Sequence, residues 1–212
     1  MSMPSRLRAT KIICTIGPAT DTSDMLGSLI QAGANVFRLN MSHSKHDWVR
    51  EVVFRIRRKA AELQANVAVL FDLQGPSIRT GDLPEPYNLK AGDIMEIRLS
   101  TAEPELPFSS TVNYDGLLQD VQAGHTMVVD NGGILMRIEE VRPDRLICKV
   151  LTEGVFGSRR HINLPGVALR LPALTEKDLK DLEVAVECEP DYVAMSFVRA
   201  AAHIAELREQ ID

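Results

Sequence analysis

The chain has 212 residues, of which 45% are hydrophobic, 25% charged and 5% aromatic. This balance is typical of a globular protein with a buried core, and it excludes a disordered, collagen-like or fibrous chain. The 24 Lys and Arg residues stand against 29 Asp and Glu residues, which gives a formal net charge of −5. Neither end carries a basic tail, so we expect no nucleic-acid partner.

The cysteine content and the hydropathy pattern indicate a cytoplasmic protein. Cys14, Cys148 and Cys188 lie far apart, are odd in number and form no C-x-x-C pair, so we expect reduced thiols. No apolar run approaches the roughly 20 residues that span a bilayer, and no signal-peptide core follows the N-terminus. We therefore expect no membrane segment.

The first 80 residues alternate short apolar segments with segments of helical periodicity. Such alternation predicts parallel βαβ units. We expect strands over 11–16, 36–39 and 67–71, and helices over 22–32 and 45–63. Asp21 and Ser23 are candidate caps for the first helix, and Gly33 is expected to end it.

Residues 81–169 have a different pattern, with prolines between short strands of alternating polar and apolar residues. The segments 134–141 and 145–151 are joined by a Pro-containing turn and predict an antiparallel hairpin. We expect a small β-rich domain inserted into the α/β one.

The α/β pattern resumes at 170–212. Thr175 followed by Asp178 three residues later resembles a capping box, and Pro190 is expected to end that helix. A fourth strand over 192–195 and a fourth helix over 200–211 follow. The predicted domains are therefore 1–80, the insertion 81–169, and 170–212.

Polar side chains follow the second predicted strand. Arg38, Asn40 and Ser42 alternate and are expected to project from one side of an extended segment. A guanidinium, an amide oxygen and a hydroxyl suit an anionic substrate and a hard cation. The alternative interpretation is a polar loop in which Ser42 and Ser44 cap the next helix.

The third and fourth predicted strands also end in polar residues. Asp72 is placed to ligate a cation beside Asn40 and Ser42, because parallel strands bring their C-terminal ends together. Arg79 suits a phosphate. In the alternative, Asp72 holds a loop through backbone N–H groups, and Ser196 after the fourth strand caps a helix. None of the histidines has metal-ligand spacing, and none is a candidate base: His43, His46, His125, His161 and His203.

Seven motifs spread over nearly the whole chain resemble pyruvate kinase. They are 10–20, 37–43, 75–81, 129–132, 163–166, 171–178 and 196–199. The resemblance implies the first half of a (β/α)8 barrel of the TIM type, interrupted after its third strand by a mobile β-rich lid. It also implies the glycolytic transfer of a phosphoryl group from phosphoenolpyruvate to ADP, which gives pyruvate and ATP.

The resemblance assigns roles to individual residues. The residue matching Arg38 binds the phosphate of phosphoenolpyruvate. The implied monovalent-cation site consists of Asn40, Ser42, Asp72 and the backbone carbonyl of Leu73. The implied nucleotide contacts are Asn40, Met41, Ser42, His43, Arg79 and Arg160. These roles suit phosphoryl transfer, which depends mainly on positioning and on positive charge.

The chain departs from the family pattern at two motifs. Potassium-dependent members have Thr-Lys and Glu where this chain has Leu73, Gln74 and Ser77. Losing a carboxylate removes negative charge that favours a cation, so we expect a weak or absent potassium requirement. Arg160 and His161 replace a Lys-Gly pair, which keeps a positive charge but changes its shape.

The family's catalytic lysine and its Mg²⁺ ligands follow the fourth helix, and they have no counterpart before Asp212. We therefore expect no complete catalytic set and little or no activity from this chain alone. A homotetramer is implied for the complete family enzyme. The alternatives are a noncatalytic relative that binds phosphorylated ligands or a partner chain, and a different barrel enzyme that uses phosphoenolpyruvate or a related keto acid, which the lid motifs disfavour.

Overall fold

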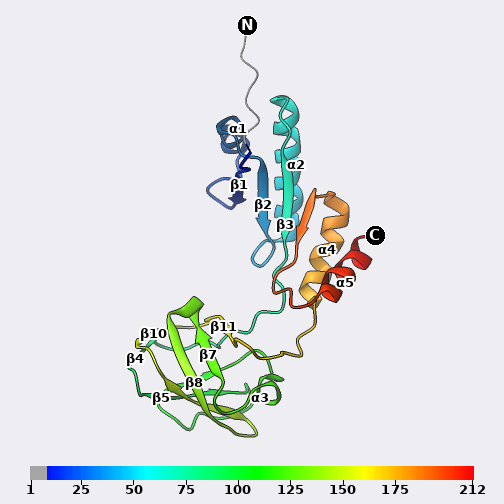
Figure 1. Ribbon diagram of the computed structural model, residues 1–212. Coiled ribbons are helices and arrows are strands. Elements are labelled where there is room, and N and C mark those ends of the chain that lie inside the picture. The colour runs from blue at the N-terminus through cyan, green and yellow to red at the C-terminus, as the bar shows by residue number, and fades with distance from the viewer. Residues whose placement is uncertain (1–8) are drawn as a thin grey trace. The chain divides into compact units, whose positions relative to one another are not determined.

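The computed structural model describes residues 9–212, and residues 1–8, where no signal segment was expected, lie outside the described residues. The chain forms two compact units. Unit 1 consists of the described residues up to Pro76 together with Pro172–Asp212, and unit 2 is Ser77–Leu171 (Figure 1).

Unit 1 is built on a four-stranded parallel sheet with the order β1-β2-β3-β12. Its strands are β1 (Ile13–Ile16), β2 (Val36–Asn40), β3 (Ala68–Asp72) and β12 (Tyr192–Ala194). Each pair of neighbouring strands is parallel, which confirms the predicted βα units. The order follows the chain, as in the first half of a parallel barrel.

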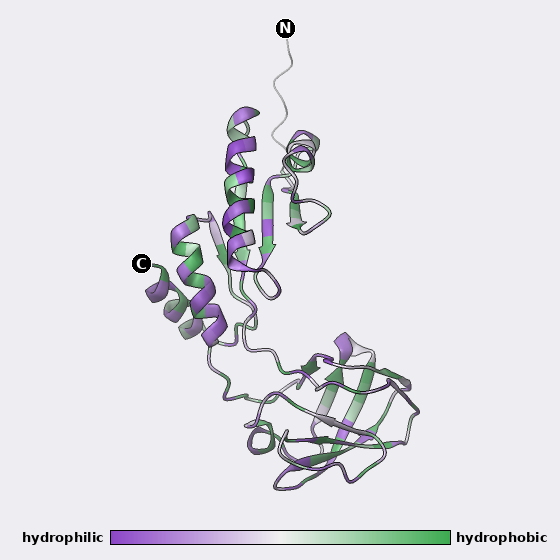
Figure 2. Cartoon of the chain, turned by 180° about the vertical axis from the view of Figure 1, so that it is seen from behind, coloured by the Kyte–Doolittle hydropathy of each residue, from purple (hydrophilic) through white to green (hydrophobic). Residues whose placement is uncertain are grey.

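Four helices cover one face of this sheet. They are α1 (Ser23–Ala32), α2 (His46–Glu62), α4 (Glu176–Cys188) and α5 (Ala201–Ile211). Phe37 and Leu39 of β2 are fully buried and belong to the same core as Val52 and Ile56 of α2, while Arg38 between them is only half-buried. The exposed residues of α2 are mostly hydrophilic, with Phe54 as an exception (Figure 2). Because side chains alternate along a strand, Arg38 and Asn40 lie on the opposite face of β2.

The helix ends show which of the predicted caps form. Thr22 caps α1 by accepting the N–H of Met25, so the expectation for Asp21 and Ser23 was wrong. The Asp21 carboxylate instead accepts the indole N–H of Trp48 at 2.8 Å, because α2 packs against α1. Gly33 ends α1 with φ 97°, as predicted.

The start of α2 differs from the alternative interpretation in which Ser42 and Ser44 cap this helix. Lys45 occupies the cap position and makes no side-chain capping hydrogen bond. The hydroxyl of Ser44 donates to the carbonyl oxygen of Asn40 at 2.7 Å, so Ser44 orders the preceding loop and does not cap the helix. By contrast, Thr175 and Asp178 form the predicted capping box of α4.

Unit 2 contains a six-stranded sheet with the order β11-β7-β8-β9-β5-β6 and a two-stranded sheet of β10 and β4. The strands are β4 (Tyr87–Leu89), β5 (Ile94–Arg98), β6 (Ser109–Thr111), β7 (Thr126–Val129), β8 (Ile134–Val141), β9 (Arg145–Val150), β10 (Gly154–Phe156) and β11 (Ile162–Asn163). The short helix α3 (Leu117–Asp120) and the 3-10 turn η1 (Asp130–Gly132) complete it.

The predicted hairpin is confirmed: β8 and β9 pair antiparallel, with an irregularity between Ile138 and Glu140. Unit 2 begins at Ser77, four residues before the expected boundary, because Ile78 is buried in its hydrophobic core. Thr80 is also buried, and its backbone pairs with Val112.

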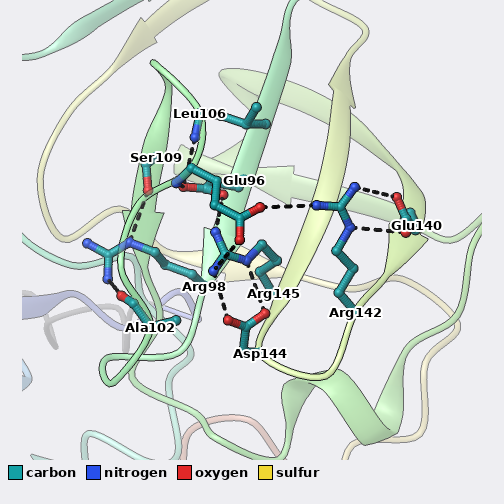
Figure 3. Close-up of polar contacts among 10 residues, drawn as sticks. Glu96, Arg98, Ala102, Leu106, Ser109, Glu140, Arg142, Asp144 and Arg145 are labelled. Carbon is teal, nitrogen blue, oxygen red and sulfur yellow. Dashed lines mark hydrogen bonds and ion pairs between the residues drawn. The ribbon is translucent and has the colours of Figure 1, made fainter.

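A buried ion pair crosses the sheet of unit 2 between β5 and β9 (Figure 3). Glu96 is fully buried, and one of its carboxylate oxygens lies 2.8 Å from Nη1 of Arg145. The other oxygen accepts the backbone N–H of Glu105 at 2.7 Å. Burial by itself raises the pKa of Glu96, but hydrogen bonds from Ser109, Glu105 and Arg145 together outweigh it and hold the pKa below its ordinary value.

We expect Glu96→Gln to lower the free energy of unfolding by about 2 kcal/mol at neutral pH, because it removes the one buried carboxylate that Arg145 contacts and leaves only the exposed carboxylates of Asp144 and Glu105. The lowered pKa stabilises the fold above the unfolded-state pKa, and this contribution is lost as the pH falls. The difference between the two proteins should therefore shrink in acid.

Urea unfolding followed by circular dichroism measures both effects. Glu139→Gln is the matched control, since Glu139 pairs with Arg137 on the exposed side of β8, and it should cost less than about 1 kcal/mol. Equal losses for the two variants would show that the Glu96–Arg145 pair does not stabilise unit 2.

Candidate functional site

The polar residues of β2 and β3 meet at the C-terminal edge of the sheet in unit 1. The register places Asn40 opposite Asp72 and Arg38 opposite Leu70. The neighbouring pair is Thr15 of β1 and Arg38. Three strands therefore contribute to one group of polar side chains, as predicted for Arg38, Asn40 and Asp72.

Arg38 lies between β1 and β3 and is held from both sides. Its Nε donates to Oδ2 of Asp72 at 2.8 Å, and its Nη2 makes an ion pair with the same oxygen. Its Nη1 donates to the hydroxyl of Thr15 at 2.8 Å. A guanidinium has five N–H donors, so N–H groups remain on Nη1 and Nη2 for an anion. The Arg38 side chain is 32% exposed, which leaves it accessible to a ligand.

The turn after β2 is ordered by hydrogen bonds within itself. Oδ1 of Asn40 accepts the backbone N–H of Ser42 at 3.1 Å, and the carbonyl of Asn40 accepts the hydroxyl of Ser44. The side chain of Met41 is fully buried, and that of His43 is exposed. Of the turn residues expected to contact nucleotide, Met41 therefore presents no side chain, and its backbone N–H and carbonyl are hydrogen-bonded to Asp72 and Lys177, whereas His43 presents its side chain.

The oxygens of the expected monovalent-cation site come from adjacent segments. Asn40 and Asp72 are register partners, Ser42 follows in the same turn, and Leu73 follows β3. Arg38 engages Oδ2 of Asp72, while Oδ1 lies 3.5 Å from the hydroxyl of Ser196. An amide, a hydroxyl, a carboxylate and a carbonyl are hard oxygen donors, and they fit a hard monovalent cation.

Arg79 and Arg160 lie in unit 2, on segments that pair with each other. The backbone N–H of Thr80 donates to the carbonyl of Arg160 at 2.8 Å, and the backbones of Arg79 and His161 form an antiparallel β-bridge. Nη1 of Arg160 lies 3.2 Å from a carboxylate oxygen of Asp130, and its buried Nε has no hydrogen-bond partner. Burial lowers the pKa of His161, and the positive charge of Arg79 lowers it further. Both effects favour the neutral form of the imidazole.

The candidate residues thus form two groups, each within one unit. Unit 1 brings together the residues at the ends of β2 and β3, and unit 2 brings together Arg79 and Arg160. The segment 79–80 pairs with the segment 160–161, and this pairing explains why the two arginines, 81 positions apart in the sequence, are neighbours.

Sequence reasoning missed the polar contacts of the first turns of α4. Lys177 donates to the carbonyl of Met41, and the buried carboxylate of Asp178 accepts the N–H of Gly75 at 3.0 Å. Gly75 has φ 66°, and a Cβ there would lie 2.9 Å from the carbonyl oxygen of Ser196, so glycine is required. The 171–178 motif holds the signal, but in the sequence it indicates only the start of a helix and part of the family resemblance.

The part of the chain that the structure describes has neither a cluster of metal-ligand side chains nor a helix that could span a membrane. Within residues 9–212 no group of three or more His, Cys, Asp or Glu side chains could hold a metal ion. No helix within the same residues is long and apolar enough to cross a bilayer. The free cysteines are Cys14, Cys148 and Cys188.

The chain is similar to known proteins over nearly its whole length. The model of the pyruvate kinase barrel domain matches residues 7–212. The chain is 37% identical over all of its 212 residues to plastidial pyruvate kinase 2 of Arabidopsis thaliana, and 35% identical over 97% of its length to the pyruvate kinase of Staphylococcus aureus (strain USA300). It spans 36% of the length of each of these relatives. The chain therefore belongs to the pyruvate kinase family and carries part of its barrel domain.

Proposed function

We propose that this chain contributes the phosphoenolpyruvate-binding part of a phosphotransferase that converts phosphoenolpyruvate and ADP to pyruvate and ATP. The observation that carries the proposal is the placement of Arg38. Its guanidinium is fixed at the C-terminal edge of the sheet by Thr15 and Asp72, and it keeps N–H donors for an anion. The C-terminal edge is where parallel barrels bind their substrates.

The chemistry required of these residues is positioning and charge. A transferring phosphoryl group spreads negative charge over its equatorial oxygens, and fixed positive groups stabilise that charge in the transition state. Arg38 is such a group, because the ion pair with Asp72 restricts its rotamers before substrate binds. A planar guanidinium also binds two oxygens of one phosphate at once.

We further propose that Asn40, Ser42, Asp72 and the carbonyl of Leu73 hold a monovalent cation. Bound there, a cation would add positive charge beside the phosphate-binding arginine. Asn40, Met41, Ser42 and His43 of unit 1, with Arg79 and Arg160 of unit 2, are the proposed nucleotide contacts. The family pattern implies the role of a mobile lid for unit 2.

The whole reaction requires groups that residues 9–212 do not provide. A divalent metal, Mg²⁺ in the family pattern, neutralises phosphate charge when bound, and residues 9–212 contain no acidic cluster that could hold it. We propose that the 212 residues alone turn over slowly or not at all. We also propose a cytoplasmic location and a homotetrameric complete enzyme, as implied by the family pattern.

We expect Arg38→Met to weaken binding of phosphoenolpyruvate by about 10- to 100-fold, because it removes charged hydrogen bonds to the phosphate. The affinity of Arg38→Lys should lie between those of the unmodified chain and of Arg38→Met, since an ammonium keeps the charge without the planar fork. Isothermal titration calorimetry measures the affinity. Arg58→Met, which removes an exposed arginine from α2, is the matched control, and an affinity unaffected by Arg38→Met would refute the proposed site.

Turnover of the purified 212-residue chain tests the expectation that these residues alone are inactive. A coupled assay of pyruvate and ATP formation at saturating magnesium should give no more than a trace of activity. Ordinary turnover would overturn this expectation. The alternative function is a noncatalytic protein that binds phosphorylated ligands or a partner chain, and it predicts a stable folded product of this length in cells that binds ligand without turnover.

We expect little dependence of phosphoenolpyruvate binding on potassium, because Ser77 replaces the glutamate of potassium-dependent relatives. The affinity in potassium chloride should lie within about twofold of that in tetramethylammonium chloride at equal ionic strength. Ser77→Glu should increase the dependence, since it restores negative charge. A steep potassium requirement in the unmodified chain would contradict this prediction.

A further inference from the structure

The turn that follows β2 is held by a lysine from α4. Nζ of Lys177 donates to the carbonyl oxygen of Met41 at 2.7 Å and to Oδ2 of Asp181 at 2.7 Å. Oδ1 of Asp181 lies 2.8 Å from Nε2 of His46, the first residue of α2. The Asp181 side chain is fully buried, and those of Lys177 and His46 are half-buried. We call Lys177, Asp181 and His46 the clamp.

The clamp acts on one peptide group of the candidate site. The peptide between Met41 and Ser42 is bound at both ends, since its C=O accepts from Lys177 and its N–H donates to Oδ1 of Asn40 at 3.1 Å. The N–H of Met41 donates to the carbonyl of Asp72 at 3.0 Å. Turning this peptide would therefore break the bond to Lys177 and the bond to the Asn40 side chain together.

Stabilisation of α4 does not explain the position of Lys177. It is the second residue of the helix, where the helix dipole disfavours a positive charge. The order of lysine followed four residues later by an acid is also the less favourable one for a helix pair. Holding a long side chain in one rotamer costs conformational entropy as well. The hydrogen bond to the carbonyl of Met41 therefore explains why a lysine lies at this position, since α4 itself gains no stability from it.

Asp181 has a corresponding role. A buried carboxylate is costly unless its oxygens are paired, and here each oxygen contacts a different partner. Lys177 is consequently held at one place beside the turn. Its ammonium reaches the turn of one βα unit from the helix of another.

We propose that the clamp is a positioning device for the site at the end of β2. Lys177 sets the orientation of the Met41–Ser42 peptide, and this keeps the amide oxygen of Asn40 and the hydroxyl of Ser42 in place for ligands. Asp181 and His46 hold Lys177 in its working position. The identity of those ligands rests on the proposed function, whereas the ordering of the peptide does not.

The test compares Lys177→Met with Lys177→Arg and with Lys180→Met, an exposed lysine on the same helix. Amide hydrogen exchange measured by NMR should be about fivefold faster at Ser42 in Lys177→Met, as expected for one lost hydrogen bond. Lys177→Arg should restore slow exchange, because it keeps charged donors. Lys180→Met should leave exchange at Ser42 unchanged.

Unchanged exchange at Ser42 in Lys177→Met overturns the proposal. So does a uniform rise in exchange over unit 1, because that shows general loosening of the fold. If Lys177→Met does not fold, Lys177→Gln replaces it, since a shorter neutral donor weakens the same contact and the same two outcomes decide.

A second measurement separates this proposal from the proposed function. Phosphoenolpyruvate should bind about fivefold or more weakly to Lys177→Met than to Lys180→Met, in calorimetry at fixed salt. If the unmodified chain does not bind phosphoenolpyruvate, the proposed function fails, and the exchange data still decide the clamp. If the unmodified chain binds it and Lys177→Met binds equally well, the positioning proposal fails alone.

Discussion

The candidate site depends on the parallel, in-register pairing of β2 with β3. This pairing puts Asn40 opposite Asp72 and brings the strand ends, with their polar side chains, to one edge of the sheet. A shift by one residue would turn Arg38 and Asn40 toward the helices and Phe37 and Leu39 toward the open face. Burial of Phe37 and Leu39 against α2 therefore fixes the register on which the polar side depends.

Carboxylates connect the segments around this edge. Asp72 holds Arg38, Asp178 holds the backbone of Gly75, and Asp181 holds Lys177 and His46. Two of the three are fully buried, and each joins segments that are distant in the sequence. Because buried carboxylates are stable only when they are paired, such contacts favour one arrangement of the loops over others.

The sheet of unit 1 has two edge strands, whereas the strands of an eight-stranded barrel are paired on both sides. Ile13 of β1 and Tyr192 of β12 are exposed at these edges. A cavity of about 310 Å³ lies beside β12, with Val193, Ile204 and Leu207 in its lining. An open parallel sheet with apolar edges has a tendency to associate, which matters for handling the chain in solution.

The sequence by itself determined the βα order, the family and the placement of Arg38, Asn40 and Asp72 at strand ends, because hydrophobic periodicity and local motifs are properties of neighbouring residues. It did not determine that Thr22 caps α1, that Arg38 engages Asp72, or that Lys177 holds the turn after β2. The last two contacts join residues 34 and 136 positions apart. Only the packed sheet and helices bring such residues within hydrogen-bonding distance, so the tertiary structure decided them.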